Sequence, residues 1–138
     1  MPSFRHLSRV VSMQTLFEYS VRENSDPQKI LDYNQNVFAS KVKDTTFLEK
    51  LVFGVIENRE ELDEKIREYA PEWPIEKLAL VERIILEIGL YELMFTSDTP
   101  HAVVINEAVE IAKKYGDENS NKFINGVLST ASKKMKKA

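Results

Sequence analysis

The sequence predicts an all-α protein, with about seven helices arranged in two packed helical halves. Three observations lead to this prediction. Glycine is scarce, with 4 in 138 residues, and proline occurs only 5 times, at positions 2, 27, 71, 74 and 100. Between these breaks, good helix formers run without interruption. Apolar residues recur at spacings of three and four, which is the repeat of a helix with one buried face.

The first two helices are predicted from capping residues. A helix over about residues 3–21 has Ser3 as a possible N-cap. The next helix opens with Asp26 as the cap and Pro27 at the first helical position, where a missing N–H is tolerated. It continues to about Lys41. Both helices therefore have chemically defined starts.

The third helix is expected to begin at Asp44 or Thr45 and to end before Pro71. Its apolar stripe is interrupted at Asn58 and Arg59, where the repeat calls for apolar side chains. We expect a bend or an exposed polar notch there, with a solvated kink as the simpler interpretation. The stripe consists of Leu48, Leu51, Val52, Val55, Leu62, Ile66 and Tyr69.

The second half begins at a proline corner, residues 71–74, in which Trp73 is expected to be a core side chain. The following helix, residues 80–95, is apolar around most of its circumference, which is typical of a central helix or of one that lends a face to a partner. Helices over residues 102–115 and about 118–134 complete the fold.

Length and composition predict a single globular domain, residues 1–138, with halves of about 1–70 and 71–138. The chain is 43% hydrophobic and 30% charged, which disfavours disorder. No stretch reaches the roughly 18 uncharged apolar residues of a membrane span, and the first residues do not resemble a signal peptide. We therefore expect a cytoplasmic protein.

The net charge of −3 conceals basic ends around an acidic middle. Residues 1–17 carry 2 arginines and no acid, residues 44–118 carry 18 acidic and 8 basic side chains, and residues 119–138 carry 5 lysines and no acid. If the two ends meet in the fold, they form one positive patch that could bind a polyanion. The alternative is that the lysine-rich end, which includes Lys136 and Lys137, is simply solvated.

The sequence offers little to catalysis, and we expect no enzyme, no metal and no cofactor. It contains no cysteine, its 2 histidines lie far apart, and it has no phosphate-binding glycine-rich loop. The many carboxylates have the density of a solvated helix face.

The first helix has an arginine-bearing side. On a helical wheel, Arg5, Arg9 and Ser12 lie opposite an apolar arc. Two arginines four residues apart can grip consecutive phosphates, because each guanidinium is a planar fork of donors. Gln14 points into the apolar arc, so it either bonds a neighbouring backbone or presents its amide to a ligand at the rim. Two exposed arginines that only solubilise a helix are the equally weighted alternative.

The last helix carries a polar stripe opposite its apolar face. Gly126 lies in this stripe and costs about 1 kcal/mol relative to alanine in a helix, which indicates close approach of another helix or of a ligand backbone. Phe123 beside the stripe could stack on an unpaired base. An ordinary polar face with Phe123 in the core is the alternative. The stripe consists of Asn119, Lys122, Gly126, Ser129 and Lys133.

Three segments carry a family signature: FRHLSRVVSMQTLFEY near the start, LALVERIILEIGLYEL in the middle and VVINEAVEIAKKYGDENSNKFINGVLS near the end. Together they resemble the NusB family of bacterial transcription antitermination factors. The last segment is the most specific, and the region from Arg22 to Phe53 carries no family signature.

The resemblance implies a helical protein that binds boxA, a single-stranded RNA element of ribosomal RNA leader transcripts, together with NusE, a small-subunit ribosomal protein. The pair would join RNA polymerase and other Nus factors and suppress termination. The implied RNA-binding residues are Arg5, His6, Arg9, Gln14, Tyr69, Asp117, Glu118, Asn119, Ser120, Lys122 and Phe123. The implied contacts to the protein partner are Glu82, Glu87 and Glu92.

Two alternatives stay open at this point. One is the RNA-docking domain of a ribosomal RNA methyltransferase, which uses a similar fold. The other is a helical protein-interaction module with no RNA role. The chain is expected to be a monomer or a homodimer, and an adaptor with its first and last helices side by side is the preferred interpretation.

Overall fold

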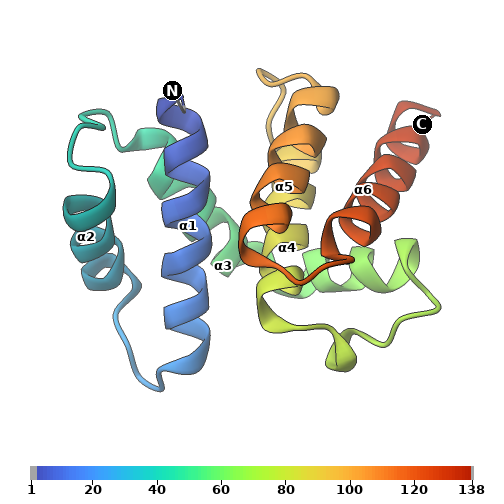
Figure 1. Ribbon diagram of the computed structural model, residues 1–138, viewed down its shortest axis with the longest axis horizontal. Helices are drawn as coiled ribbons and strands as arrows, with labels where there is room; N and C mark the ends of the chain where they lie inside the picture. Colours follow the sequence, from blue (N-terminus) through green and yellow to red (C-terminus); the bar gives the residue numbers. More distant parts are fainter. Residues whose placement is uncertain (1–2, 138) are drawn as a thin grey trace. The chain divides into compact units, whose positions relative to one another are not determined.

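The computed structural model describes residues 3–137. Within them, helices joined by loops are the only regular secondary structure, and there is no strand (Figure 1). The predicted all-α fold is confirmed. A short 3-10 turn, Ile75–Lys77, takes the place of one of the predicted helical segments. The α-helices are α1 (Phe4–Val21), α2 (Pro27–Phe38), α3 (Thr46–Tyr69), α4 (Leu80–Phe95), α5 (His101–Tyr115) and α6 (Ser120–Lys137). Ala138 and the side chain of Lys137 lie outside the described part, as do Met1 and Pro2.

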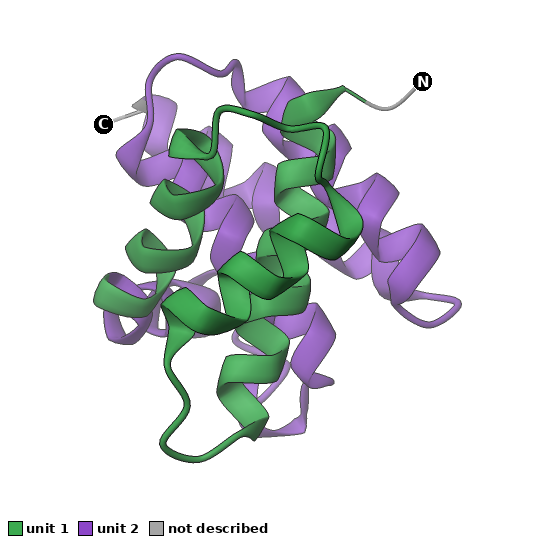
Figure 2. Ribbon diagram, turned by 90° about the vertical axis from the view of Figure 1, so that its left-hand side faces the viewer, with its two compact units in different colours: residues 1–57 green, residues 58–138 purple. Residues whose placement is uncertain are grey.

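The chain divides into two compact units, one up to Glu57 and one from Asn58 onward (Figure 2). The boundary falls inside α3, so this helix contributes its first half to unit 1 and its second half to unit 2. The predicted division near residue 70 stays a prediction.

Unit 1 is built from α1, α2 and the start of α3. Each helix begins as the capping residues predict: Ser3 accepts the N–H of His6, and Asp26 accepts the N–H of Gln28. α1 packs against α2, with Leu16 and Leu31 almost fully buried. α2 ends three residues earlier than expected, at Phe38. The Gln35 side chain donates to the carbonyls of Ala39 and Val42 at 3.0 and 2.9 Å, which stabilises a turn in place of further helix.

Unit 2 is organised around α4. Both α5 and α6 pack against α4, and they also pack against each other. Ten of the sixteen α4 residues are buried, as expected for a helix that is apolar on most sides. A Cβ at Gly89 would lie 2.8 Å from Leu128 Cδ1, so the absence of a side chain here lets α6 approach α4 closely.

Two expectations in this region are wrong. Trp73 is 55% exposed, and Ile75, which is 2% exposed, is the buried side chain of the proline corner. The Trp73 ring instead meets Phe123 edge-on. α3 also runs through Asn58 and Arg59 as one uninterrupted helix, and Arg59 has an internal ionic partner where a solvated kink was expected. No helix in residues 3–137 combines the length and the apolar character that crossing a membrane requires.

Candidate nucleic-acid interface

Arg5 and Arg9 converge on one aromatic ring within unit 1. The Cζ atom of Arg5 lies 4.4 Å from the centroid of the Phe47 ring, and that of Arg9 lies 5.1 Å from it. Phe47 belongs to the first turn of α3, so the contact joins the first turns of α1 to the start of α3. Cations bind to the electron-rich face of an aromatic ring at such distances. His6, between the two arginines, is half-buried.

The wheel-based placement of the arginine side is wrong for two of its three residues. Arg9 is 3% exposed and Ser12 is fully buried, whereas Arg5 is exposed. Burial of Ser12 is possible because its hydroxyl donates to the carbonyl of Ser8 at 2.7 Å, which satisfies it within the helix. Small serines therefore occupy the packed side of α1, whereas Phe17, a large apolar residue of the same helix, is 40% exposed. Arg5 therefore reaches the solvent, and Arg9 does not.

Gln14 is half-buried, and its side-chain oxygen is buried without a hydrogen-bond donor among the described residues. A buried acceptor without a partner is unfavourable by about 1–3 kcal/mol. The expectation that it bonds a neighbouring backbone is therefore wrong for the oxygen. The alternative, an amide that meets a ligand, stays a prediction.

The loop between α5 and α6 holds its polar side chains in two groups. Asp117 and Ser120 form the capping group: the Asp117 N–H donates to Ser120 Oγ at 3.0 Å, and Asp117 Oδ1 accepts from the N–H of Asn119 at 3.4 Å and from the Ser120 hydroxyl at 3.1 Å. Ser120 is 1% exposed and also donates to Glu82 of α4. A Cβ on Gly116 would lie 2.7 Å from Ser120, so a glycine is required there. Ser120 thus links α6 to α4, and its buried, hydrogen-bonded hydroxyl group is not placed for direct contact with RNA.

The second group is available to a ligand. Glu118, Asn119 and Lys122 are exposed at the start of α6. One turn further, Gly126 is exposed, and a Cβ built on it meets nothing within 4 Å. The expected close approach of another helix is therefore wrong within the described residues, and the alternative, the approach of a ligand backbone, stays a prediction.

Phe123 is half-buried and lies edge-on to Trp73, with ring centroids 6.0 Å apart. An edge-to-face contact of this kind stabilises the fold by more than the burial of the two rings alone. Because Trp73 is mostly exposed, its ring supplies a face on which a base could stack. The sequence did not indicate an exposed ring at Trp73, because a large hydrophobic residue in a proline corner is expected to be buried.

Tyr69, at the end of α3, is surrounded by lysines. The Nζ atoms of Lys134 and Lys65 lie 5.4 and 6.0 Å from its ring centroid. The ring borders a cavity of about 530 Å³ in unit 2, which is also lined by His101 and Lys136. An aromatic ring beside several cations is suited to a base and its phosphate.

The three acidic side chains predicted to meet a protein partner are held inside unit 2. Glu82 is half-exposed, but its oxygens accept from the Ala79 N–H and the Ser120 hydroxyl. Glu92 is 2% exposed and Glu87 is fully buried. Because both side chains are buried, the geometry does not favour direct contact of Glu87 or Glu92 with a protein partner.

Glu87 belongs to a buried charge network. Arg59 donates to both of its carboxylate oxygens, at 3.0 Å each, and Arg83 binds Asp63 and lies 3.6 Å from Glu87. Burial, followed by the hydrogen bond to Asp63, raises the pKa of Glu87 to about 8, against the lowering effect of Arg59. Burial also favours a raised pKa for Asp63, but its hydrogen bonds to Glu87 and Arg83 outweigh it and leave that pKa below the ordinary value.

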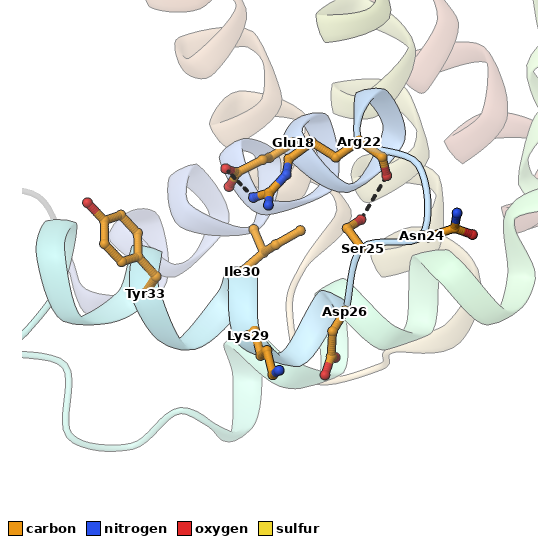
Figure 3. Close-up of a pocket in the computed structure, with 8 residues that line it drawn as sticks. All are labelled: Glu18, Arg22, Asn24, Ser25, Asp26, Lys29, Ile30 and Tyr33. Atoms are coloured by element: carbon orange, nitrogen blue, oxygen red, sulfur yellow. Dashed lines mark hydrogen bonds and ion pairs between the residues drawn. The ribbon is translucent and has the colours of Figure 1, made fainter.

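A further cavity, of about 610 Å³, lies in unit 1 between the end of α1 and the start of α2 (Figure 3). An ion pair between Glu18 and Arg22 at 3.2 Å lies at its wall, and Ser25 donates to the Arg22 carbonyl. None of the predicted RNA-binding residues lines this cavity. The described residues include no group of three or more His, Cys, Asp or Glu side chains placed to hold a metal ion.

Comparison with known proteins assigns the chain to a family. The model of the NusB family matches residues 6–133. The protein belongs to the NusB family. A transcription antitermination protein NusB of Bacillus cereus (strain B4264) is 40% identical over 125 residues, which is 91% of this chain and 94% of the relative.

Solved NusB-family structures have the same fold. NusB of T. maritima is 34% identical, with a TM-score of 0.83 over 96% of this chain and 93% of that one. A crystal structure of the antitermination factors NusB and NusE in complex with double-stranded RNA contains a chain that is 28% identical, with a TM-score of 0.82 over 97% of this chain and 99% of that one.

Proposed function

We propose that this protein is an RNA-binding transcription antitermination factor that acts together with a NusE-type ribosomal protein. The observation that carries the proposal is the match to the NusB family over residues 6–133, joined to a full-length likeness to a NusB chain that was crystallised with NusE and RNA. The finer part of the proposal is that the RNA is a single-stranded boxA element, and that the complex joins RNA polymerase and other Nus factors in the cytoplasm.

Two surfaces of the chain support RNA as the ligand. In unit 1, Arg5 is exposed and stacked on Phe47. In unit 2, Asn119 and Lys122 are exposed beside the Trp73–Phe123 ring pair. Cations for phosphates, amides for base edges and rings for stacking are the combination by which single strands are recognised. The proximity of α1 and α6 to each other stays a prediction.

The first experiment is fluorescence anisotropy of a labelled single-stranded boxA RNA, titrated with the protein alone and with equimolar NusE. A scrambled strand and a boxA duplex serve as comparison RNAs. We expect a preference for single-stranded boxA, tighter binding with NusE, and a salt dependence with a slope of about −0.7 per phosphate contact. Equal binding of boxA and scrambled RNA in the presence of NusE would favour a protein-interaction module, and preference for the duplex would contradict the single-stranded part.

Removal of a single lysine tests the proposed RNA-binding surface of unit 2 by itself. Lys122→Ala should weaken binding and reduce the salt slope by about 0.7, because one phosphate contact is lost. The matched control is Lys113→Ala, which removes an exposed lysine of α5 that pairs with Glu110 at 3.5 Å. Equal losses in the two variants would mean that Lys122 acts only through overall charge.

Gly126→Ala separates a ligand role from a folding role. Alanine is the better helix former and meets nothing within 4 Å, so we expect the free energy of unfolding to rise by about 0.5–1 kcal/mol. If RNA passes close to this backbone, the added methyl group should nevertheless weaken binding. A variant that is more stable and binds RNA as well as the wild type would remove Gly126 from the interface.

A further inference from the structure

Trp73 exposes a large aromatic ring at a restricted corner of unit 2. Its side chain is 55% exposed, although aromatic rings contribute most to stability when they are buried. Pro71 and Pro74 restrict the backbone of the corner, and the Trp73 N–H donates to the Ala70 carbonyl at 3.2 Å. Ile75, which is 2% exposed, anchors the corner in the core. The exposed ring therefore projects from a backbone that is already fixed.

Phe123 restricts the orientation of the indole ring. The two ring centroids lie 6.0 Å apart, and the ring planes meet at 75°, which is an edge-to-face contact. In such a contact one ring covers at most one face of the other, so Phe123 leaves at least one face of the indole uncovered. Phe123 is half-buried in α6, so it connects the indole to a packed helix. An aromatic side chain that is held in advance loses little rotamer freedom when it binds a ligand.

The polar side chains next to the two rings suit a nucleotide. Lys122 directly precedes Phe123, and both Lys122 and Asn119 are exposed. The Phe123 N–H donates to the Asn119 carbonyl at 3.3 Å, so Asn119 lies one helical turn before Phe123, on the same side. A lysine can bind a phosphate, and an amide can bind the edge of a base that lies on an aromatic face.

The acidic side chains around Trp73 disfavour a ligand that presents only phosphates. Glu72 and Glu76 are exposed on either side of Trp73 in the sequence, and Glu118 is exposed just before α6. Carboxylates repel phosphates, whereas a base is uncharged and can approach the ring. In a duplex the faces of a base are covered by its neighbours in the stack, so only unpaired RNA offers a face to an aromatic side chain.

From this geometry we infer that Trp73 selects unpaired RNA by stacking a base on its indole face, with Phe123 as a positioning residue that holds the ring. The inference rests on the proposed function, since it names the side chain of unit 2 by which a single strand is preferred to a duplex. Stacking of an uncharged base releases no counterions, so the contribution of Trp73 to affinity should not depend on salt. The contribution of Lys122 should depend on salt, because it is a phosphate contact.

The first test uses the fluorescence of Trp73 itself, because it is the single tryptophan of the chain. Unlabelled single-stranded boxA RNA is titrated into the protein with NusE present, and the same titration of Trp73→Phe measures the background from NusE. Stacking of a base should quench the indole emission, and a boxA duplex should quench it less. A signal that responds to NusE alone and not to RNA would assign the ring to a protein contact and overturn the inference.

The second test measures the affinity of Trp73 variants for single-stranded and duplex boxA at several salt concentrations, with NusE present. Trp73→Leu should weaken binding of the single strand at least about fivefold with an unchanged salt slope, because one base–ring contact is lost. Duplex binding should change by less than about twofold, and Trp73→Phe, which keeps a ring, should bind the single strand within about threefold of wild type. Phe38→Leu is the matched control, because Phe38 in α2 is also 55% exposed, and it should bind like wild type.

Phe123→Leu tests the positioning role. This substitution should weaken binding of the single strand, but by less than about twofold when it is combined with Trp73→Leu, because Phe123 acts through Trp73. It should also reduce the quenching of Trp73 at saturating RNA, which a loss of stability alone would not do. Additive losses in affinity would overturn the positioning role of Phe123.

Failure of this inference can be told apart from failure of the proposed function. If wild type binds boxA no better than scrambled RNA, the proposed function fails. If wild type prefers boxA but its Trp73 emission is unchanged at saturation, or if Trp73→Leu binds the single strand as wild type does, Trp73 is not the selecting residue. Equal losses for single strand and duplex, or a smaller salt slope in Trp73→Leu, would also exclude stacking. Unfolding midpoints identify any variant that fails to fold, and the quenching of wild type needs no variant.

Discussion

The two units of this protein use arginine in opposite ways. In unit 1, Arg5 and Arg9 lie over an aromatic ring, with Arg5 exposed. In unit 2, Arg59 and Arg83 are committed to carboxylates: Arg59 donates twice to the fully buried Glu87, and Arg83 donates to Asp63. The residue type is the same, and the partner decides its role. Contact with a ring face leaves the guanidinium group at the edge of the packed structure, whereas a two-pronged contact with a buried carboxyl group ties the arginine to the stability of the fold.

Arg59→Ala should have the largest effect on stability. The substitution leaves Glu87 buried without its bidentate partner, and loss of one partner from such a pair is typically destabilising by about 3–5 kcal/mol. We expect about 2–3 kcal/mol near neutral pH, because Glu87, with a pKa of about 8, already holds a proton there and Arg83 stays 3.6 Å from it. Urea unfolding measures the change.

The matched control for this prediction is Arg67→Ala in the same helix. Arg67 reaches Glu76 at 3.8 Å, but both side chains are more than half exposed, so the loss should stay below about 0.5 kcal/mol. Equal effects for the two variants would contradict the distinction between buried and exposed pairs.

The charge network should also make stability depend on pH. The raised pKa of Glu87, about 8, means that the folded state binds a proton which the unfolded state releases at lower pH. This stabilisation is complete below the ordinary glutamate pKa and is lost as pH rises through about 8. Between about pH 6.5 and pH 9 the free energy of unfolding should fall by about 2 kcal/mol.

Glu87→Gln identifies the group responsible. Glutamine keeps the shape and cannot ionise, so its stability should vary little over the same pH range, and the two curves should converge or cross at the alkaline end. A wild-type curve that is flat from pH 6.5 to 9, or a slope that survives in Glu87→Gln, would show that Arg59 keeps Glu87 ionised throughout.

Most of the fold could be predicted from local chemistry. Ser3, Asp26 and Asp44 each accept a backbone N–H near the start of a helix, as their residue types predict. The apolar residues around most of the circumference of α4 also predicted a central helix or one that lends a face to a partner, because this pattern can be seen within the segment itself. The prediction that Trp73 is a core residue was wrong. Large hydrophobic side chains are buried on average, but only the tertiary arrangement decides which side chain fills the proline corner.

The candidate site was harder to predict, since its contacts join residues distant in sequence. Phe47 lies where no family signature was found, and nothing in its neighbourhood indicates two arginines from another helix. The packed side of α1 was also misjudged, because Ser12 satisfies its hydroxyl within the helix and can be buried as readily as an apolar residue. Exposure of the Asn119 and Lys122 side chains could be predicted, because the side chain of Asp117 supplies the cap at this turn.

Arg5→Ala should have a much smaller effect on stability than Arg59→Ala, and it completes the comparison because the same side chain is removed. The cation–π contact contributes about 0.5–1 kcal/mol, and other contacts of an exposed side chain are weakened by water, so the free energy of unfolding should fall by no more than about 2 kcal/mol, with little variation between pH 6.5 and 9. Arg22→Ala, which removes an exposed arginine from the other end of α1, is the control for charge alone. A loss above about 2 kcal/mol for Arg5→Ala would mean that Arg5 is needed for the stability of the fold as Arg59 is, and that contact with an aromatic ring does not by itself distinguish the two arginines.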